Sequence, residues 1–226
     1  PVLKLRSWRV RKEGHIGQII LHSPEKLNAI DLTMLHELMI VLEACNRDEE
    51  VRVVVLGGEG RSFCAGADLQ SLQAAGDQAP VLGREMARVA GEVALKIRQL
   101  NKPVIASLKG AVAGAGFNLA LVSDFRIAAD SCKFIQAFIN IGLIPDTGGM
   151  FLLCRMMGTG KATELAMTGH PISAQEAVAM GLLTSVVALD DLESQTMQFA
   201  EKLADSPGQA LRRIKSLVNQ TEYSGF

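Results

Sequence analysis

Short apolar runs that alternate with amphipathic helical segments constrain the fold of this chain more than any other feature. The runs lie at residues 52–56, 103–108 and 125–128, and the first, rich in valine, ends at the pair Gly57-Gly58. Continuous apolar and β-branched runs are typical of strands buried on both faces. Strands that alternate with helices connect through right-handed crossovers and pair in parallel. The pattern therefore predicts an α/β fold with a largely parallel sheet.

Helix and turn signals fill the intervals around these runs. Residues 2–21 are predicted to form a hairpin with its turn at Glu13-Gly14. Asp31 stands at the N-cap position of a helix whose apolar residues recur at helical spacing. A second amphipathic helix is predicted over about residues 82–100. These elements and the buried strands make up a predicted core over residues 1–147.

The pattern changes to mostly helical after this core, and residues 148–226 are predicted to form a separate C-terminal region. Ser173 and Glu176 have the spacing of a capping box at the start of one of its helices. A short strand is expected over residues 184–189. Two final helices are expected near residues 190–205 and 208–219.

Composition excludes several classes of function. The chain of 226 residues has 23 Lys+Arg against 24 Asp+Glu and only 4% aromatic residues, which argues against a partner such as nucleic acid or an anionic membrane. No apolar run reaches the roughly 20 residues of a membrane span, and no signal core is present at the N-terminus. The four cysteines form no C-x-x-C pair, as expected for reduced thiols. The expected location is the cytoplasm.

Familiar ligand-binding motifs are incomplete in this sequence. Residues 158–163 resemble a phosphate-binding loop, but Arg155 and Ala162 stand where that motif needs Gly and Ser or Thr. The glycines of residues 110–116 do not have dinucleotide-binding spacing, and no G-x-S-x-G elbow is present. The four histidines lie far apart, so no metal site is predicted.

Two turns rich in small residues are the strongest candidates for a chemical site. Residues 62–69 and residues 109–119 each follow a buried strand, and each places Gly and Ala where no side chain can obstruct a backbone N–H. The second turn opens a helix, whose first N–H groups and positive dipole end are free to bind an oxygen atom. Two such turns side by side would form an oxyanion hole. Close packing of helix on strand through Gly and Ala is the alternative explanation.

Five segments resemble the crotonase (enoyl-CoA hydratase/isomerase) superfamily, in that family's order. They are HSPEKLNAI at 22–30, SFCAGADL at 62–69, KGAVAGAGFNLALVSDFRIAAD at 109–130, FIQAFINIGLIPDTGG at 134–149 and ISAQEAVAMGLL at 172–183. The resemblance implies a crotonase-like (ClpP/crotonase) spiral of ββα units with a helical C-terminal region for trimerisation. It also implies a homotrimer, or a hexamer as a dimer of trimers. Family members commonly continue into further C-terminal helices, so this chain is expected to stop short of them.

The same resemblance implies an acyl-CoA thioester substrate, no cofactor beyond the coenzyme A of that substrate, and no metal. It places the two oxyanion donors on the backbone N–H groups of Ala67 and Ala115. It implies that substrate and coenzyme A contact a set of residues in the loops and the glycine-rich helix: Lys26, Leu27, Ala65, Asp68, Leu69, Gly114, Asn118 and Phe138. An exposed loop lysine and ordinary loop packing remain the alternative for the members near residue 26.

The acid/base positions depart from the hydratase pattern. Hydratases of this family use two glutamates. The resemblance places Asn118 and Phe138 at those two positions. Phe138 is expected to lie on a further strand. Asp146 remains, at the position that holds the sole catalytic acid in the branch that includes the phenylacetate-pathway isomerases. Its alternative role is the N-cap of the helix that begins near Gly148. We predict double-bond isomerisation of an enoyl-CoA through Asp146; a divergent hydratase or a non-catalytic acyl-CoA-binding subunit are the alternatives.

Overall fold

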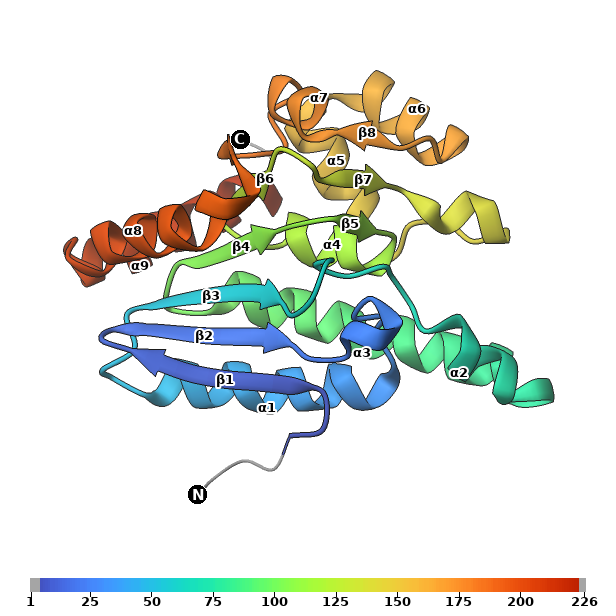
Figure 1. Cartoon of the computed structure of the whole chain (residues 1–226), viewed down its shortest axis with the longest axis horizontal. Coiled ribbons are helices and arrows are strands. Elements are labelled where there is room, and N and C mark those ends of the chain that lie inside the picture. Colours follow the sequence, from blue (N-terminus) through green and yellow to red (C-terminus); the bar gives the residue numbers. More distant parts are fainter. Residues whose placement is uncertain (1–4, 224–226) are drawn as a thin grey trace.

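The structure is a computed structural model and describes residues 5–223. Its strands form two sheets, one of six strands in the order β1-β2-β3-β4-β6-β9 and one of three in the order β5-β7-β8 (Figure 1). The strands are β1 (Trp8–Glu13), β2 (Ile16–Leu21), β3 (Val53–Gly58), β4 (Val104–Leu108), β5 (Ala111–Ala113), β6 (Phe125–Ala129), β7 (Lys133–Ile135), β8 (Ile172–Ser173) and β9 (Ser185–Val187). Every pairing in the larger sheet is parallel except that of β1 with β2. The predicted α/β fold with a largely parallel sheet is confirmed.

Nine α-helices lie between and after these strands within residues 5–223. They are α1 (Leu32–Arg47), α2 (Leu69–Ala74), α3 (Ala79–Gln99), α4 (Ala115–Leu121), α5 (Gly149–Met157), α6 (Thr159–Thr168), α7 (Ala174–Ala179), α8 (Leu192–Ala204) and α9 (Gly208–Tyr223). The Asp31 side chain accepts a hydrogen bond from Met34 N at the start of α1, and Ser173 and Glu176 form the predicted capping box of α7. The helix predicted over 82–100 begins earlier, at Ala79, because a proline is tolerated in a first helical turn.

Two successive ββα units divide their strands between the two sheets. In the first, β4 joins the larger sheet, β5 joins the smaller sheet, and α4 follows; in the second, β6 and β7 divide in the same way ahead of α5. The short strands β5 and β8 were not predicted, because two or three residues are too few to show a strand period. A strand was expected to reach Phe138, and the structure has one, β7, that ends earlier, at Ile135. Phe138 lies beyond that strand, on a 3-10 helix, η3 (Ala137–Ile141), so its predicted position on a strand is wrong.

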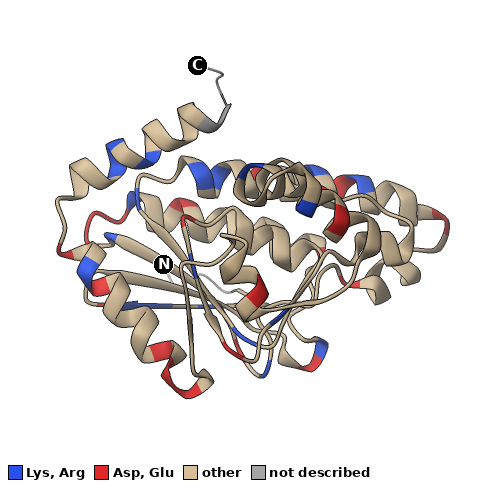
Figure 2. Ribbon diagram, turned by 90° about the horizontal axis from the view of Figure 1, so that it is seen from above, with Lys and Arg blue, Asp and Glu red and all other residues tan. Residues whose placement is uncertain are grey.

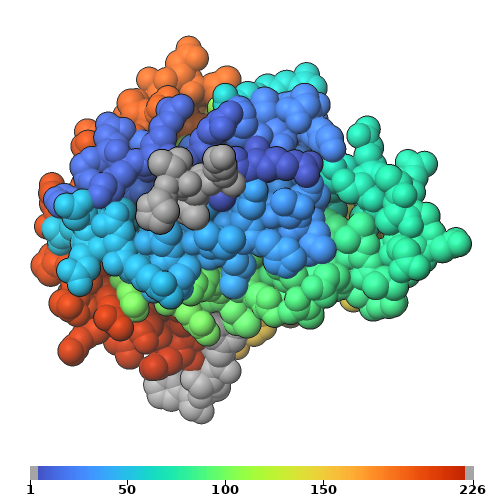
Figure 3. Space-filling model, turned by 90° about the horizontal axis from the view of Figure 1, so that it is seen from below, coloured from blue at the N-terminus to red at the C-terminus, as the bar shows by residue number. Residues whose placement is uncertain are grey.

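Helices cover both faces of the larger sheet. Alternate residues of a strand point to opposite faces, so Ile19 and Leu21 enter the buried core while Gln18 and Ile20 line a gap beneath α8. Figure 1 shows α1 and α3 running along one side of β1 to β3. In the space-filling view from below, α1 and α3 lie across the middle of the face, and the segment around α2 projects at one edge (Figure 3).

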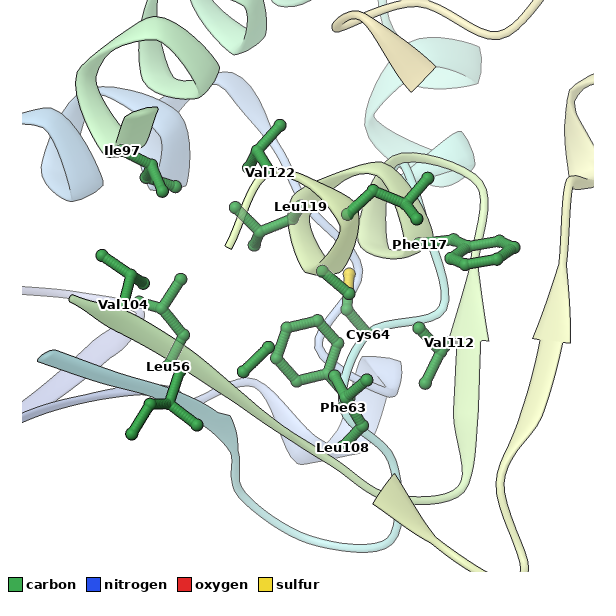
Figure 4. Packing of buried hydrophobic residues seen from close by; sticks show 14 of the residues in the cluster. Leu56, Phe63, Cys64, Ile97, Val104, Leu108, Val112, Phe117, Leu119 and Val122 are labelled. Atoms are coloured by element: carbon green, nitrogen blue, oxygen red, sulfur yellow. The ribbon is translucent and has the colours of Figure 1, made fainter. Parts of the chain in front are cut away.

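The core continues from the larger sheet to the turn that follows β3. Figure 4 shows Phe63 and Cys64 beneath α4, near Leu108 of β4 and Val112 of β5. Both Phe63 and Cys64 are fully buried, and Phe117 of α4 packs on Phe134 with ring centroids 5.4 Å apart. This packing fixes the turn after β3 against the start of α4, where the sequence predicts the oxyanion donors.

A buried ion pair fixes α9 to the rest of the chain. Lys215 Nζ donates to Asp124 Oδ2 at 2.6 Å and to two backbone carbonyls, those of Ile97 and Lys102. Asp124 Oδ2 also accepts from Val104 N, so this aspartate has a structural role. Burial lowers the pKa of Lys215. Charged residues elsewhere are spread over helices and loops with both signs interspersed (Figure 2).

In the part of the chain that the structure describes, no helix is long and apolar enough to cross a membrane. The same residues hold no cluster of three or more His, Cys, Asp or Glu side chains that could bind a metal ion.

Candidate active site

Backbone pairing sets the two small-residue turns side by side. Cys64 forms a parallel bridge with Val112, and its N–H and C=O bond to Ala111 O at 3.1 Å and Ala113 N at 3.0 Å. Ala67 and Ala115 each lie three residues beyond this bridge, so the two predicted donors follow the same pairing. A Cβ on Gly66 would lie 3.9 Å from Ala115 N, which confirms that the two turns touch.

Glycines aim the N–H groups that follow them. Gly66 has φ +108° and Gly114 has φ +49°, conformations that residues with a Cβ rarely adopt. Each glycine therefore lets the chain turn sharply just before a predicted donor, Ala67 or Ala115. Within residues 5–223, no backbone hydrogen bond uses the N–H of either alanine. Both N–H groups are thus available to one acceptor, as an oxyanion hole requires.

Both alanines line an apolar cavity of about 230 Å³. Its walls come from the two turns, from α2, α3 and α4, and from η3 and the loop after it. The lining residues include Ala65, Gly66, Ala67, Leu69, Leu72, Gly83, Met86, Ala87, Ala90, Val93, Gly114, Ala115, Leu119, Val122, Phe138, Asp146 and Thr147. Among the described residues that line this cavity, Asp146 carries the only ionisable side chain.

The side chain of Asp146 is held by other side chains, while its backbone carbonyl accepts from Gly149 N at the start of α5. Its Oδ1 accepts a hydrogen bond from Thr147 Oγ1 at 2.8 Å and a longer one from Asn118 Nδ2 at 3.4 Å. The N-cap residue of α5 is Gly148, and in the described part of the chain no side-chain hydrogen bond caps this helix. The alternative that the Asp146 side chain caps this helix is therefore wrong, and its carboxylate remains at the cavity wall.

Asn118 lies behind this carboxylate and does not line the cavity. It is fully buried, its Nδ2 donates to Asp146 O at 2.9 Å, and its Oδ1 accepts from Gln136 Nε2 at 3.1 Å. Phe138 is buried and does line the cavity, where a Cβ on Gly114 would lie 3.9 Å from its ring. The two positions expected to hold glutamates in a hydratase thus present an amide turned away from the cavity and an apolar ring.

A third group of predicted residues lies beside the cavity. Lys26 Nζ bonds to Asp68 Oδ2 at 2.8 Å, and Ala65 N bonds to Leu27 O at 3.0 Å. Burial alone raises the pKa of Asp68, but hydrogen bonds from Lys26 and Ser71 outweigh it and lower that pKa, while Asp68 raises the pKa of Lys26. Asp68 also caps α2. Of these residues only Ala65 reaches the cavity itself.

Comparison with known proteins identifies the family. The sequence profile of the family described as Enoyl-CoA hydratase/isomerase matches residues 11–224. The chain belongs to the enoyl-CoA hydratase/isomerase family. Its fold agrees with a solved structure described as an enoyl-CoA hydratase from Polaromonas sp. JS666, with a TM-score of 0.93 and 36% identity over 97% of this chain and 85% of the other. The predicted crotonase-like fold is confirmed.

Relatives within the enoyl-CoA hydratase/isomerase family carry different activity names. A trans-2-decenoyl-[acyl-carrier-protein] isomerase from Streptococcus mutans is 34% identical over 95% of this chain and 82% of its own length. A 1,2-epoxyphenylacetyl-CoA isomerase from Escherichia coli is 39% identical over 93% of this chain and 80% of its own. Others are named enoyl-CoA hydratases. Family membership therefore fixes the enzyme class, and the site must distinguish the reactions.

Several residues of this family member's site were not predicted from the sequence. Small residues of α3, Gly83, Ala87 and Ala90, recur at helical spacing and line the cavity. The apolar stripe of the same helix predicted only a core face, although the small residues beside it were a visible signal of free space. Thr147 gave no such signal, because its contact with Asp146 depends on a backbone φ of +54°.

Proposed function

We propose that this member of the enoyl-CoA hydratase/isomerase family moves a carbon–carbon double bond within an enoyl thioester. One observation carries the proposal: a single ionisable side chain among the described lining residues, Asp146, shares an apolar cavity with the N–H groups of Ala67 and Ala115. Isomerisation needs one group that removes a proton and returns it nearby. Addition of water needs a polar place for that water, which Phe138 does not provide.

The reaction starts with the thioester carbonyl between the two N–H groups. Asp146 removes a proton from C2 of a 3-enoyl thioester, and the electron pair of that C–H bond moves toward the carbonyl oxygen to form a dienolate. The protonated Asp146 then returns the proton to C4, and the double bond is left between C2 and C3. No atom is gained or lost, so one carboxyl group and one oxyanion hole suffice.

The two backbone donors stabilise the charge that develops on the carbonyl oxygen. An oxyanion-hole donor contributes roughly 3–4 kcal/mol to the transition state, because the charge forms in a site from which water is excluded. The wall around Ala67 and Ala115 is apolar, with Leu72, Met86 and Leu119 among its residues. The effective dielectric constant is low there, and each hydrogen bond to the oxyanion is correspondingly strong.

The rest of the substrate is assigned from the family resemblance. We expect coenzyme A to follow Lys26, Leu27, Ala65, Asp68 and Leu69, and we expect the enzyme to need no cofactor or metal beyond that thioester. Two of these residues, Ala65 and Leu69, line the cavity, and Lys26 is exposed beside them. The names of two relatives supply two acyl groups for testing, a decenoyl chain and a 1,2-epoxyphenylacetyl group. A homotrimer or a hexamer is expected, and analytical ultracentrifugation measures it.

Hydration of a 2-enoyl-CoA is the second candidate function, because relatives of similar identity carry hydratase names. It requires a group that activates water. Asn118 is fully buried and turned toward Asp146, and it is not basic. An acyl-CoA-binding subunit without chemistry is the third candidate, and the cavity alone would serve it.

A substrate panel distinguishes the three candidates. The purified protein is incubated with 3-enoyl-CoA and 2-enoyl-CoA thioesters of several chain lengths and with a ring-type thioester, and products are separated by chromatography and mass. Isomerisation appears as a shift of the double bond at constant mass, and hydration as a gain of one water. We expect the first. Hydration of crotonyl-CoA faster than any isomerisation would overturn the proposal, as would binding without turnover.

A further inference from the structure

The hydrogen bonds of Asp146 are unevenly divided between its two carboxylate oxygens. Oδ1 accepts from Thr147 Oγ1 at 2.8 Å and from Asn118 Nδ2 at 3.4 Å. Within residues 5–223, no hydrogen bond or ion pair reaches Oδ2. A carboxylate held by one oxygen keeps the lone pairs of the other for a proton.

Thr147 reaches Asp146 Oδ1 from a backbone conformation that is unfavourable for threonine. Its φ is +54°, in the left-handed region, where a β-branched residue is rare. Such a conformation persists only where the surroundings impose it, and it is often found at functional sites. Here it brings the Thr147 hydroxyl to the carboxylate of the preceding residue, and glycine at the next position, Gly148, completes the turn with φ +76°. The strain therefore accompanies a specific contact.

Asn118 holds the main chain of Asp146, and Gln136 fixes the direction of the Asn118 side-chain amide. The two Asp146 oxygens that Asn118 contacts, O and Oδ1, accept hydrogen bonds in the carboxylate form, so Asn118 must turn Nδ2 toward them. Its Oδ1 then faces Gln136 Nε2 at 3.1 Å. Asn118 and Gln136 are both fully buried, and Gln136 Oε1 has no hydrogen-bond partner. Leaving Gln136 Oε1 buried without a partner costs free energy. The one hydrogen bond that Gln136 makes, to Asn118 Oδ1, is therefore a specific constraint on Asn118.

We propose that Thr147 is a positioning residue that holds Asp146 by Oδ1, so that Oδ2 is the atom that takes the proton from C2 and returns it at C4. Asn118, oriented by Gln136, fixes the backbone of Asp146 in support. The inference rests on the proposed isomerase function and adds to it the identity of the reacting oxygen and of the group that presents it. Thr147 acts through Asp146 and is not a catalytic residue.

Three substitutions at one position test the role of the hydroxyl. Thr147→Ser keeps the hydroxyl, Thr147→Val keeps the shape without it, and Thr147→Gly removes it while allowing the positive φ. For each variant, kcat and KM are measured on the best 3-enoyl-CoA substrate of the wild-type enzyme, together with the thermal midpoint. The glycine variant keeps the test valid if the valine variant fails to fold.

The expected result separates kcat from KM. Thr147→Val and Thr147→Gly should lower kcat by about 10- to 100-fold, the effect of losing one hydrogen bond to a charged group, with KM within about 2-fold. Thr147→Ser should restore kcat to within about 3-fold of wild type. The midpoint of Thr147→Gly should not fall, because glycine relieves the strained φ.

Two results would overturn the inference while leaving the isomerase proposal intact. One is wild-type kcat in Thr147→Gly. The other is a rise in KM with kcat unchanged, which would mean that Thr147 binds the substrate directly. Failure of the proposed function looks different, because the wild-type enzyme itself would then isomerise no 3-enoyl thioester, and the inference would fall with it.

Discussion

Replacing Gly149 by alanine should disable the site from outside the cavity. Gly149 is the first residue of α5, and its backbone allows an alanine. A Cβ there would lie 2.3, 2.6 and 2.7 Å from Oδ1, Cγ and Nδ2 of Asn118, well inside contact distance. Asn118 is fully buried and bonded to Asp146 and Gln136, so its amide cannot move away without breaking those bonds.

The cost can be worked out from these contacts. Overpacking a buried site costs about 1–3 kcal/mol, and a buried amide that loses its partners costs about 1–3 kcal/mol more. The helix preference of alanine over glycine offsets up to about 1 kcal/mol. The free energy of unfolding should therefore fall by about 1–5 kcal/mol. For a chain of this length that lowers the thermal midpoint by about 2–20 °C.

Differential scanning fluorimetry and the isomerase assay measure the two consequences. Gly91→Ala is the matched control. Gly91 lies within α3, and apart from the adjoining backbone of that helix and its two chain neighbours no atom lies within 4 Å of an added Cβ. The substitution should raise the midpoint by about 1–4 °C with unchanged turnover. Gly149→Ala should lower kcat as well as the midpoint, because Asn118 no longer fixes Asp146. Wild-type stability and turnover in Gly149→Ala would refute the reasoning.

Three further predictions concern groups away from the reacting atoms. Lys215→Met removes the cation that pairs with the largely buried carboxylate of Asp124, and chemical denaturation should show a loss of about 3–5 kcal/mol; a loss below about 1 kcal/mol would contradict this. Lys26 lowers the folded pKa of Asp68, so Lys26→Met should be less stable than wild type at pH 7. This difference in stability should vanish as the pH falls below about 4 and through the lowered folded pKa. A difference that persists at pH 2 would count against this ion pair. Burial raises the pKa of Cys64 and of Cys132 to about 12, so iodoacetamide should label both only after unfolding in guanidinium, and labelling of the native protein at pH 8 would contradict their burial.

Periodicity and capping chemistry made the larger sheet and its helices predictable. A buried strand such as β3 and an N-cap such as Asp31 depend on neighbouring residues alone, so their signals lie within a short window of sequence. The smaller sheet was not predictable in this way. Strands of two or three residues such as β5 and β8 exist because another segment pairs with them.

The part of the site that depends on local sequence signals was predictable. Small residues around Ala67 and Ala115 indicated exposed N–H groups, and the register between Cys64 and Val112 then brings the two turns together. The environment of Asp146 was not predictable from the sequence. Its partner Thr147 depends on a positive φ that no local pattern in the sequence indicates, and Phe138 reaches the cavity from a 3-10 helix instead of a strand.

The turnover of Asp146→Asn tests the central claim most directly. Asparagine keeps the size of the side chain and removes its capacity to take a proton, so binding of the thioester should be unchanged and only the chemistry should fail. General acid/base groups contribute about 100- to 10,000-fold. We predict that kcat for 3-enoyl-CoA isomerisation falls by that factor while the dissociation constant of a saturated acyl-CoA stays within about 3-fold of wild type. A kcat within about 3-fold of wild type would contradict the account and place the proton transfer on another group.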